Sequence, residues 1–326
     1  MNRLCLRRAL LGTLLTLGLW INRPCAGAEA VELMSGVKVT FASVTEGSNF
    51  LKQRDDFIAG LSPFERAARM VTNRTVSEAE FLAFVETNVV AWREEETDRM
   101  AKVLQRVGKK LEPWSLPFPK TILMIKSTGR EEIEADYTRR NGIIIPENLV
   151  RGASDNVVIH ELFHVLSRAN PPLREKLYNL IGFQRINEVE LTAELLERKW
   201  TNPDGVQNGW RLSVTNQNQE ISVVPGLYAP GSFDYNAPVN PFGFFRLLVV
   251  TNSAAGTWSP LLVDGHPKIL ATREVKGFNE QIGNNTRYVI HPDEVLADNF
   301  IQFINGRTNA PTPRILERMR QIFTTP

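Results

Sequence analysis

Residues 155–167 read DNVVIHELFHVLS and contain the sequence HELFH at positions 160–164. This stretch has no glycine or proline, follows Ser154, and is followed in turn by Pro171 and Pro172. A serine before the first helical residue and prolines beyond the last one are typical of a helix. We therefore predict a helix of about three to four turns that carries the HELFH residues near its middle.

The spacing within this helix predicts a metal site. Residues four apart on a helix differ by about 40° in direction and about 6 Å in height, so His160 and His164 can hold one ion between them. Glu161 is turned aside by about 100°, which places it beside the ion rather than on it. A carboxylate there can accept a proton from a metal-bound water. His160 and His164 are thus predicted metal ligands, and Glu161 a predicted catalytic base.

A catalytic zinc ion usually has three protein ligands, so a third one is needed. The arrangement HExxHxxGxxH is excluded, because Ser167 and Asn170 stand where it requires glycine and histidine. We favour Glu294 as the third ligand. Glu188 or Glu190, about 24 to 26 residues after His164, is the alternative, since either would suit a following helix.

Glu294 belongs to a second predicted helix that begins at Pro292. Asp298 lies four residues further on and shares its face. One carboxylate can then bind the metal while Asp298 accepts the N–H of a ligand imidazole and fixes its orientation. Tyr288 is our first choice for stabilising the oxyanion of a tetrahedral intermediate. Tyr228 and Tyr235 are the reserves.

These two motifs resemble those of the gluzincin group of zinc metallopeptidases, in which HExxH is completed by a Glu on a later helix, often with an Asp four residues beyond it. His160, Glu161 and His164 match the first motif, and Glu294 with Asp298 matches the second. About 130 residues separate the motifs here, compared with a few tens in the best-known members. The resemblance implies one zinc ion, a peptide or protein substrate, and an α+β, zincin-like catalytic domain with a small mixed sheet. It also implies an edge strand that aligns the peptide, by position residues 142–145.

Residues 1–28 have the pattern of a secretory signal. Basic Arg3, Arg7 and Arg8 precede an apolar run that ends at residue 21, and small residues up to Ala28 follow. The run is too short to span a bilayer as a helix, so we predict no stable membrane insertion. Cleavage near Ala28 would give a secreted or periplasmic chain.

Cleavage would also change the charge and the cysteine content. Of the 38 basic residues, 34 would remain against 36 acidic ones, so the apparent net charge of +2 belongs mainly to the signal. We therefore predict no nucleic-acid partner. Both cysteines, Cys5 and Cys25, would be removed, which leaves histidines and carboxylates as the ligands for a transition metal. Oligomeric state is not indicated.

The remainder of the chain is predicted to have two parts. Capping patterns and helical periodicity predict a mainly helical N-terminal lobe over residues 29–112, which as an alternative would be a propeptide. Prolines at 113, 117 and 119 end it. Residues 113–326 form the predicted catalytic domain, beginning with a strand at residues 121–126. Residues 201–290, rich in Gly, Pro and Asn, are predicted to be an insertion of strands and loops.

The predicted function is a secreted or periplasmic zinc peptidase in which Glu161 activates the attacking water. One alternative is a non-catalytic, exported metal-binding or interaction protein that retains a vestigial site. A second alternative is a zinc hydrolase that acts on a non-peptide bond. The physiological substrate, the cleavage preference and the choice between endo- and exopeptidase are not indicated by these motifs.

Overall fold

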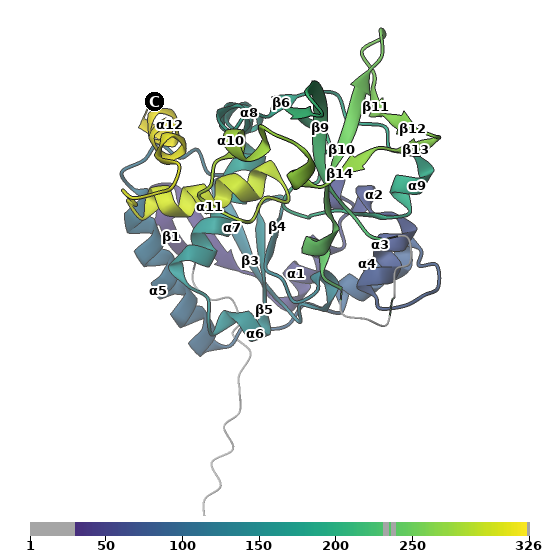
Figure 1. The fold of residues 1–326 in the computed structure, drawn as a ribbon. Coiled ribbons are helices and arrows are strands. Elements are labelled where there is room, and N and C mark those ends of the chain that lie inside the picture. Colours follow the sequence, from purple (N-terminus) through teal and green to yellow (C-terminus); the bar gives the residue numbers. More distant parts are fainter. Residues whose placement is uncertain (1–29, 231–234, 236–238, 325–326) are drawn as a thin grey trace, which may run out of the picture.

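The computed structural model of the chain describes residues 30–230, 235 and 239–324. The predicted signal segment, residues 1–28, lies outside these described residues. The described chain combines helices with two open β-sheets and a two-stranded ribbon (Figure 1). At this level the predicted mixture of α and β structure is confirmed.

The first sheet is mixed. Its central strands pair in parallel, β2 with β3 and β3 with β5, whereas the outer pairs β1–β2 and β4–β5 are antiparallel. The five strands follow the spatial order β1 (Val31–Met34), β2 (Val37–Phe41), β3 (Thr121–Ser127), β5 (Gly142–Pro146) and β4 (Tyr137–Arg139).

The edge strand next to the HELFH helix is β4, and the assignment of residues 142–145 to the edge was wrong. That segment is β5, which is buried throughout and lies between β3 and β4. Strands β4 and β5 form an antiparallel hairpin, with Thr138 opposite Ile143. Strand β4 lies at the edge of the sheet because the other side of β5 pairs with β3.

Helices cover both faces of this sheet, as the alternation of its apolar side chains requires. Met124 and Ile143 belong to the larger hydrophobic core, which also contains residues of α5 (Glu94–Leu111) and α7 (Asp155–Ala169). Their chain neighbours Ile125 and Ile144 belong to a second core on the opposite face, which contains residues of the early helices. These are α1 (Val44–Leu51), α2 (Asp56–Gly60), α3 (Pro63–Arg69) and α4 (Glu78–Glu86).

The two helices that carry the predicted site lie against each other. In Figure 1, α11 (Pro292–Ile304) runs beside α7, and the two are in contact. Helix α7 begins where the sequence predicts, since Ser154 Oγ accepts a hydrogen bond from Val157 N at 3.4 Å. The remaining helices are α6 (Glu147–Val150), α8 (Pro171–Leu180), α9 (Ala193–Leu196), α10 (Phe278–Ile282) and α12 (Pro313–Thr324).

The second sheet is antiparallel and is formed largely by the predicted insertion. The main path is β11 (Trp258–Pro260), β10 (Phe245–Asn252), β9 (Gln219–Tyr228), β8 (Trp210–Asn216) and β6 (Gln184–Arg185). Strand β14 (Ile269–Leu270) pairs with β10, and β7 (Lys199–Trp200) pairs with β9. The ribbon consists of β12 (Leu262–Val263) and β13 (His266–Pro267).

The structure differs from the predicted division at residue 112. Strand β2 pairs in parallel with β3, from Lys38 opposite Thr121 to Phe41 opposite Met124. Residues before and after the boundary therefore share one sheet and one core. Residues 30–112 contain the helices α1 to α5 together with the strands β1 and β2. Within the described part of the chain, none of the helices is both long enough and apolar enough to cross a membrane.

Candidate metal centre

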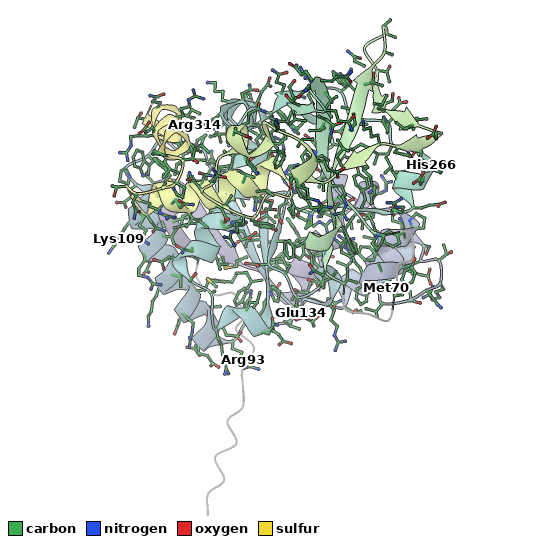
Figure 2. All side chains as sticks on the ribbon, in the orientation of Figure 1. Met70, Arg93, Lys109, Glu134, His266 and Arg314 are labelled. Atoms are coloured by element: carbon green, nitrogen blue, oxygen red, sulfur yellow. The ribbon has the colours of Figure 1, made fainter. Side chains whose placement is uncertain are left out.

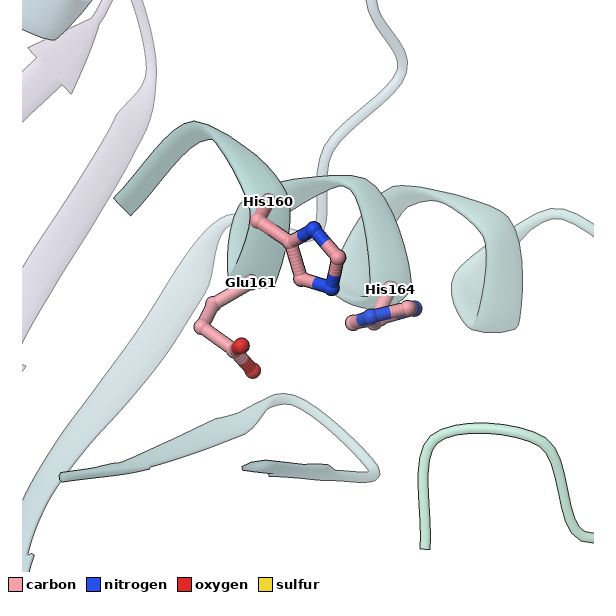
Figure 3. Close-up of side chains that lie close together, drawn as sticks. All are labelled: His160, Glu161 and His164. Atoms are coloured by element: carbon pink, nitrogen blue, oxygen red, sulfur yellow. The ribbon is translucent and has the colours of Figure 1, made fainter. Parts of the chain in front are cut away.

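Three side chains of the HELFH motif, those of His160, Glu161 and His164, project from one side of α7 (Figure 3). The rings of His160 and His164 are 4.8 Å apart, centroid to centroid. His164 is fully buried, whereas 15% of the His160 side chain is exposed. His160, Glu161 and His164 each offer one ligand atom within 4.8 Å of the others. The helix therefore presents both imidazoles and the carboxylate to a common space.

Helix α11 adds Glu294 to this space. Glu294 Oε2 lies 3.0 Å from His160 Nε2 and 3.5 Å from His164 Nε2. Ligand atoms about 2.0 to 2.1 Å from a tetrahedral zinc ion are about 3.3 Å apart, so these two distances bracket the expected value. Asn202 holds the second oxygen, donating from Nδ2 to Glu294 Oε1 at 2.6 Å. The favoured third carboxylate thus meets both histidines across the interface of α7 and α11.

The outer nitrogens of both histidines face carboxylates. His164 Nδ1 lies 2.7 Å from Asp293 Oδ2, and His160 Nδ1 lies 3.3 Å from Asp298 Oδ1. An Nδ1–H that donates to a carboxylate fixes the neutral tautomer in which Nε2 carries a lone pair. Both Nε2 atoms are therefore set up to act as metal ligands.

Asp293 was missed by the sequence analysis, although it is the more firmly held of these two carboxylates. Its other oxygen accepts hydrogen bonds from Ser167 Oγ at 2.6 Å and from Tyr178 Oη at 2.7 Å. The residue stands directly before Glu294, so a signal for it was present in the sequence. Asp293 is not related to Glu294 by the four-residue spacing that relates Asp298 to it, so that spacing did not indicate it.

Glu161 is oriented by the edge strand. Thr138 Oγ1, on β4, donates a hydrogen bond to Glu161 Oε2 at 2.8 Å. Burial, opposed by the charge of His164, raises the pKa of Glu161 to about 7. A carboxyl with a pKa near neutrality can both accept and return a proton at physiological pH.

The donor set fits a divalent metal ion. His164 Nε2 is buried and has no hydrogen-bond partner within the described chain, which is costly for a polar atom unless a ligand engages it. Two imidazole nitrogens and one carboxylate are a donor set found at catalytic zinc sites. Buried clusters of His, Glu and Asp could therefore hold a metal ion here.

A cavity of about 390 Å³ opens onto these groups and is lined by His160, Glu161 and Glu294. Tyr288 also lines it, and its ring stacks on that of His160 at 6.0 Å with an interplanar angle of 16°. Tyr288, our first choice for stabilising the oxyanion, therefore lies beside the candidate ligand His160. The reserve Tyr228 instead lines a separate cavity.

The alternative ligands Glu188 and Glu190 and the two remaining histidines have other partners. Glu188 accepts a hydrogen bond from Asn208 N and lines that separate cavity, and neither Glu188 nor Glu190 belongs to a metal-binding cluster of the described residues. His266 lies at the rim of the molecule (Figure 2) and forms an ion pair with Glu194. His291 caps α11, accepting a hydrogen bond from Asp293 N.

Asp204 is a further group that the sequence analysis did not identify. It offers a ligand atom within 4.8 Å of those of His164 and Glu294, and it lines the same cavity. Its sequence context, Pro203-Asp204-Gly205, is typical of a turn and gives no sign of a distant partner.

No family model, no curated protein and no solved structure matches this chain. Its function has therefore to be inferred from its own residues and their geometry.

Proposed function

We propose that this chain is an exported, zinc-dependent peptidase of the gluzincin type that uses Glu161 as its general base. The observation that carries the proposal is the meeting of the two motifs. Glu294 lies about 130 residues after His164, yet its Oε2 is 3.0 Å from His160 Nε2 and 3.5 Å from His164 Nε2. Three donors of the types that catalytic zinc prefers thus surround one space at the wall of a cavity.

His160, His164 and Glu294 would hold the ion, with Asp293 and Asp298 fixing the two imidazoles. A bound zinc ion supplies Lewis-acid activation of a water molecule and of the substrate carbonyl. Glu161 accepts the proton of the attacking water and returns it to the leaving amine, so that the peptide bond is hydrolysed without net proton change at the carboxylate. Thr138 keeps this carboxylate turned toward the cavity.

The developing negative charge on the carbonyl oxygen needs a hydrogen-bond donor. Tyr288 is suited to this role because it lines the same cavity as Glu161. Burial raises the pKa of its hydroxyl far above the ordinary value, so the group keeps its proton. Tyr288→Phe should therefore lower turnover while zinc binding is retained.

The test compares zinc content and cleavage of a mixed peptide library for the chain beginning at Glu29 and for three variants. Glu161→Gln should keep zinc, because Gln can still accept the Thr138 hydrogen bond, but lose about 10²- to 10⁴-fold in turnover. Glu294→Ala should lose zinc affinity. Glu188→Gln, which alters the rejected alternative ligand, is the matched control and should change neither.

Two outcomes would overturn the proposal. A wild-type chain that holds no zinc would remove the metal centre. A Glu161→Gln variant that cleaves as fast as wild type would remove the general base. Zinc binding without cleavage of any peptide would favour the metal-binding protein or the hydrolase of a non-peptide bond.

A further inference from the structure

Asp204 lies on the loop that connects β7 to β8, far along the chain from both metal-binding helices. The described residues contain two clusters suited to a metal ion, and these clusters share His164. The first consists of the HELFH residues, and the second of His164, Asp204 and Glu294. The second cluster therefore adds a carboxylate that neither sequence motif contains.

The loop is tied to the helix that carries the histidines. Arg168, four residues after His164 on α7, donates from Nη2 to Pro203 O at 2.5 Å and to Asp204 O at 3.3 Å. Asn202 Oδ1 accepts from Asp204 N at 3.1 Å, and Asn202 Nδ2 donates to Glu294. The position of Asp204 is thus fixed relative to His164 and Glu294.

The edge strand orients the Asp204 carboxylate. Thr138 N, on β4, donates a hydrogen bond to Asp204 Oδ1 at 2.6 Å. A carboxylate has two oxygens and several lone pairs, so it can accept this bond and still offer an atom to a metal ion. The same residue, Thr138, orients Glu161 through its hydroxyl. One strand residue therefore positions two of the carboxylates in the cavity.

The charge of the cavity also points to a cation. Glu161, Asp204 and Glu294 line one cavity, and Glu161 and Glu294 are buried. Carboxylates gathered in a region of low dielectric are costly unless a positive charge compensates them. A divalent ion near His164 and Glu294 would compensate Asp204 most directly, since their ligand atoms lie within 4.8 Å of one another.

We propose that Asp204 is a further protein ligand of the metal ion, alongside His160, His164 and Glu294. This inference rests on the metal-binding part of the proposed function and not on peptide hydrolysis. It differs from the three-ligand set implied by the sequence motifs. An additional carboxylate ligand would raise the affinity for a divalent ion.

The test measures zinc affinity of the metal-free chain by competition with a chromogenic chelator. Asp204→Asn is the informative variant, because Asn retains an Oδ1 that can accept the Thr138 hydrogen bond. Asp136→Asn is the matched control, since Asp136 lines the same cavity but belongs to neither metal-binding cluster. We expect Asp204→Asn to weaken zinc binding about tenfold or more. Asp136→Asn should weaken it less than about threefold.

A second readout follows the coordination itself. The visible absorption of the Co²⁺-loaded chain should change in Asp204→Asn and stay as in wild type in Asp136→Asn. If Asp204→Asn does not fold, a crystal structure of the zinc-loaded wild type replaces it. An Asp204 oxygen within about 2.2 Å of the ion supports the proposal, and a longer distance overturns it.

The outcomes separate this inference from the proposed function. Equal zinc affinities for the two variants would show that Asp204 acts only through its charge, and the proposal of ligation falls while the peptidase proposal stands. A wild-type chain without zinc affinity would overturn both. A tenfold loss confined to Asp204→Asn supports ligation, whether or not the chain cleaves peptides.

Discussion

At the scale of single residues, Asp293 joins the two metal-binding helices. It accepts hydrogen bonds from Ser167 and Tyr178 and faces His164 Nδ1 at 2.7 Å. The corresponding contact of Asp298 to His160 Nδ1 is longer, at 3.3 Å, and the side chain of Asp298 is 28% exposed. Asp293 should therefore contribute more to the orientation of its histidine than Asp298 does.

We predict that Asp293→Asn lowers zinc affinity about 10- to 100-fold, the usual effect of removing a carboxylate behind a ligand histidine. Asp298→Asn should have a smaller effect. Both affinities are measured by chelator competition, with thermal unfolding of the metal-free chains as the control for folding. An equal or reversed order of the two effects would contradict this interpretation.

Glu131 offers a residue-scale prediction on pH and stability. Burial raises the pKa of Glu131, whose carboxyl accepts a hydrogen bond from Tyr137 Oη at 3.3 Å. The folded state therefore binds the carboxyl proton of Glu131 more tightly than the unfolded state does. The resulting contribution to the free energy of unfolding is fully present below about pH 4. It is lost as the pH rises through the higher pKa of the folded state.

Glu131→Gln removes the part of the pH dependence of stability that comes from this carboxyl. At pH 7 the variant should be more stable than wild type by an amount on the order of 1 kcal/mol, the cost of a buried polar group with incomplete hydrogen bonds. The difference should disappear near pH 4. Urea unfolding at several pH values measures both, and exposed Glu134→Gln is the control. Parallel pH profiles for wild type and Glu131→Gln would rule this explanation out.

The sequence indicated some site residues and not others for a physical reason. His160, Glu161 and His164 are related by helical spacing, which fixes their relative directions without knowledge of the fold. Asp204 meets His164 only because a loop of the second sheet folds back over α7. No local pattern encodes such a contact, so the sequence could not indicate it.

At the scale of elements, local signals again predicted more than long-range ones. The capping patterns of the N-terminal region are Ser62 with Glu65 and Ser77 with Glu80, and both pairs form capping boxes, at the starts of α3 and α4. The order of strands was not predictable in the same way. The order depends on the pairing of β3 with β5, which are not adjacent in the chain. Because β5 pairs with β3 on one side and with β4 on the other, β4 lies at the edge of the sheet.

Helix α5 provides an element-scale prediction. Gly108 faces β1 so closely that an added Cβ would lie 2.0 Å from Leu33 O. Helix propensity alone would favour alanine by about 1 kcal/mol. The clash should prevail, because Leu33 O is a backbone atom of β1. Its chain neighbours Glu32 and Met34 are both paired with β2, so the carbonyl cannot move aside cheaply.

We therefore expect Gly108→Ala to reduce the free energy of unfolding by about 1–3 kcal/mol. Gln105→Ala, at an exposed position on the same helix, should change it by less than about 0.5 kcal/mol. Urea unfolding measures both variants. A more stable Gly108→Ala would mean that α5 and β1 can separate freely.

At the scale of the whole molecule, the two sheets and their loops combine to form a second cavity beside the metal centre. Its volume is about 160 Å³, and it shares Asp136, Asp204, Phe242 and Tyr288 with the metal-centre cavity. Much of its lining is apolar and comes from segments far apart in the chain: Ile133, Trp200, Leu227, Val239 and Ile290. The charge of Glu132, which also lines it, is paired with Arg69.

An apolar cavity of about 150 Å³ can hold one benzene ring, so this cavity is large enough for a side chain such as Phe or Leu. If the chain is a peptidase, its cleavage sites should be enriched in such a residue at one position next to the scissile bond. Ala135 is exposed and lines both cavities, so a larger side chain there should occupy space at their shared lining.

Ala135→Phe should therefore raise KM for peptides with Phe or Leu at that position by about tenfold or more, while zinc affinity stays unchanged. Ala135→Ser, which adds little volume, is the control and should behave as wild type. Library profiling of the three chains measures the preference directly. Enrichment of Lys or Arg would mean that Asp136, at the junction of the cavities, selects the substrate instead of the apolar lining.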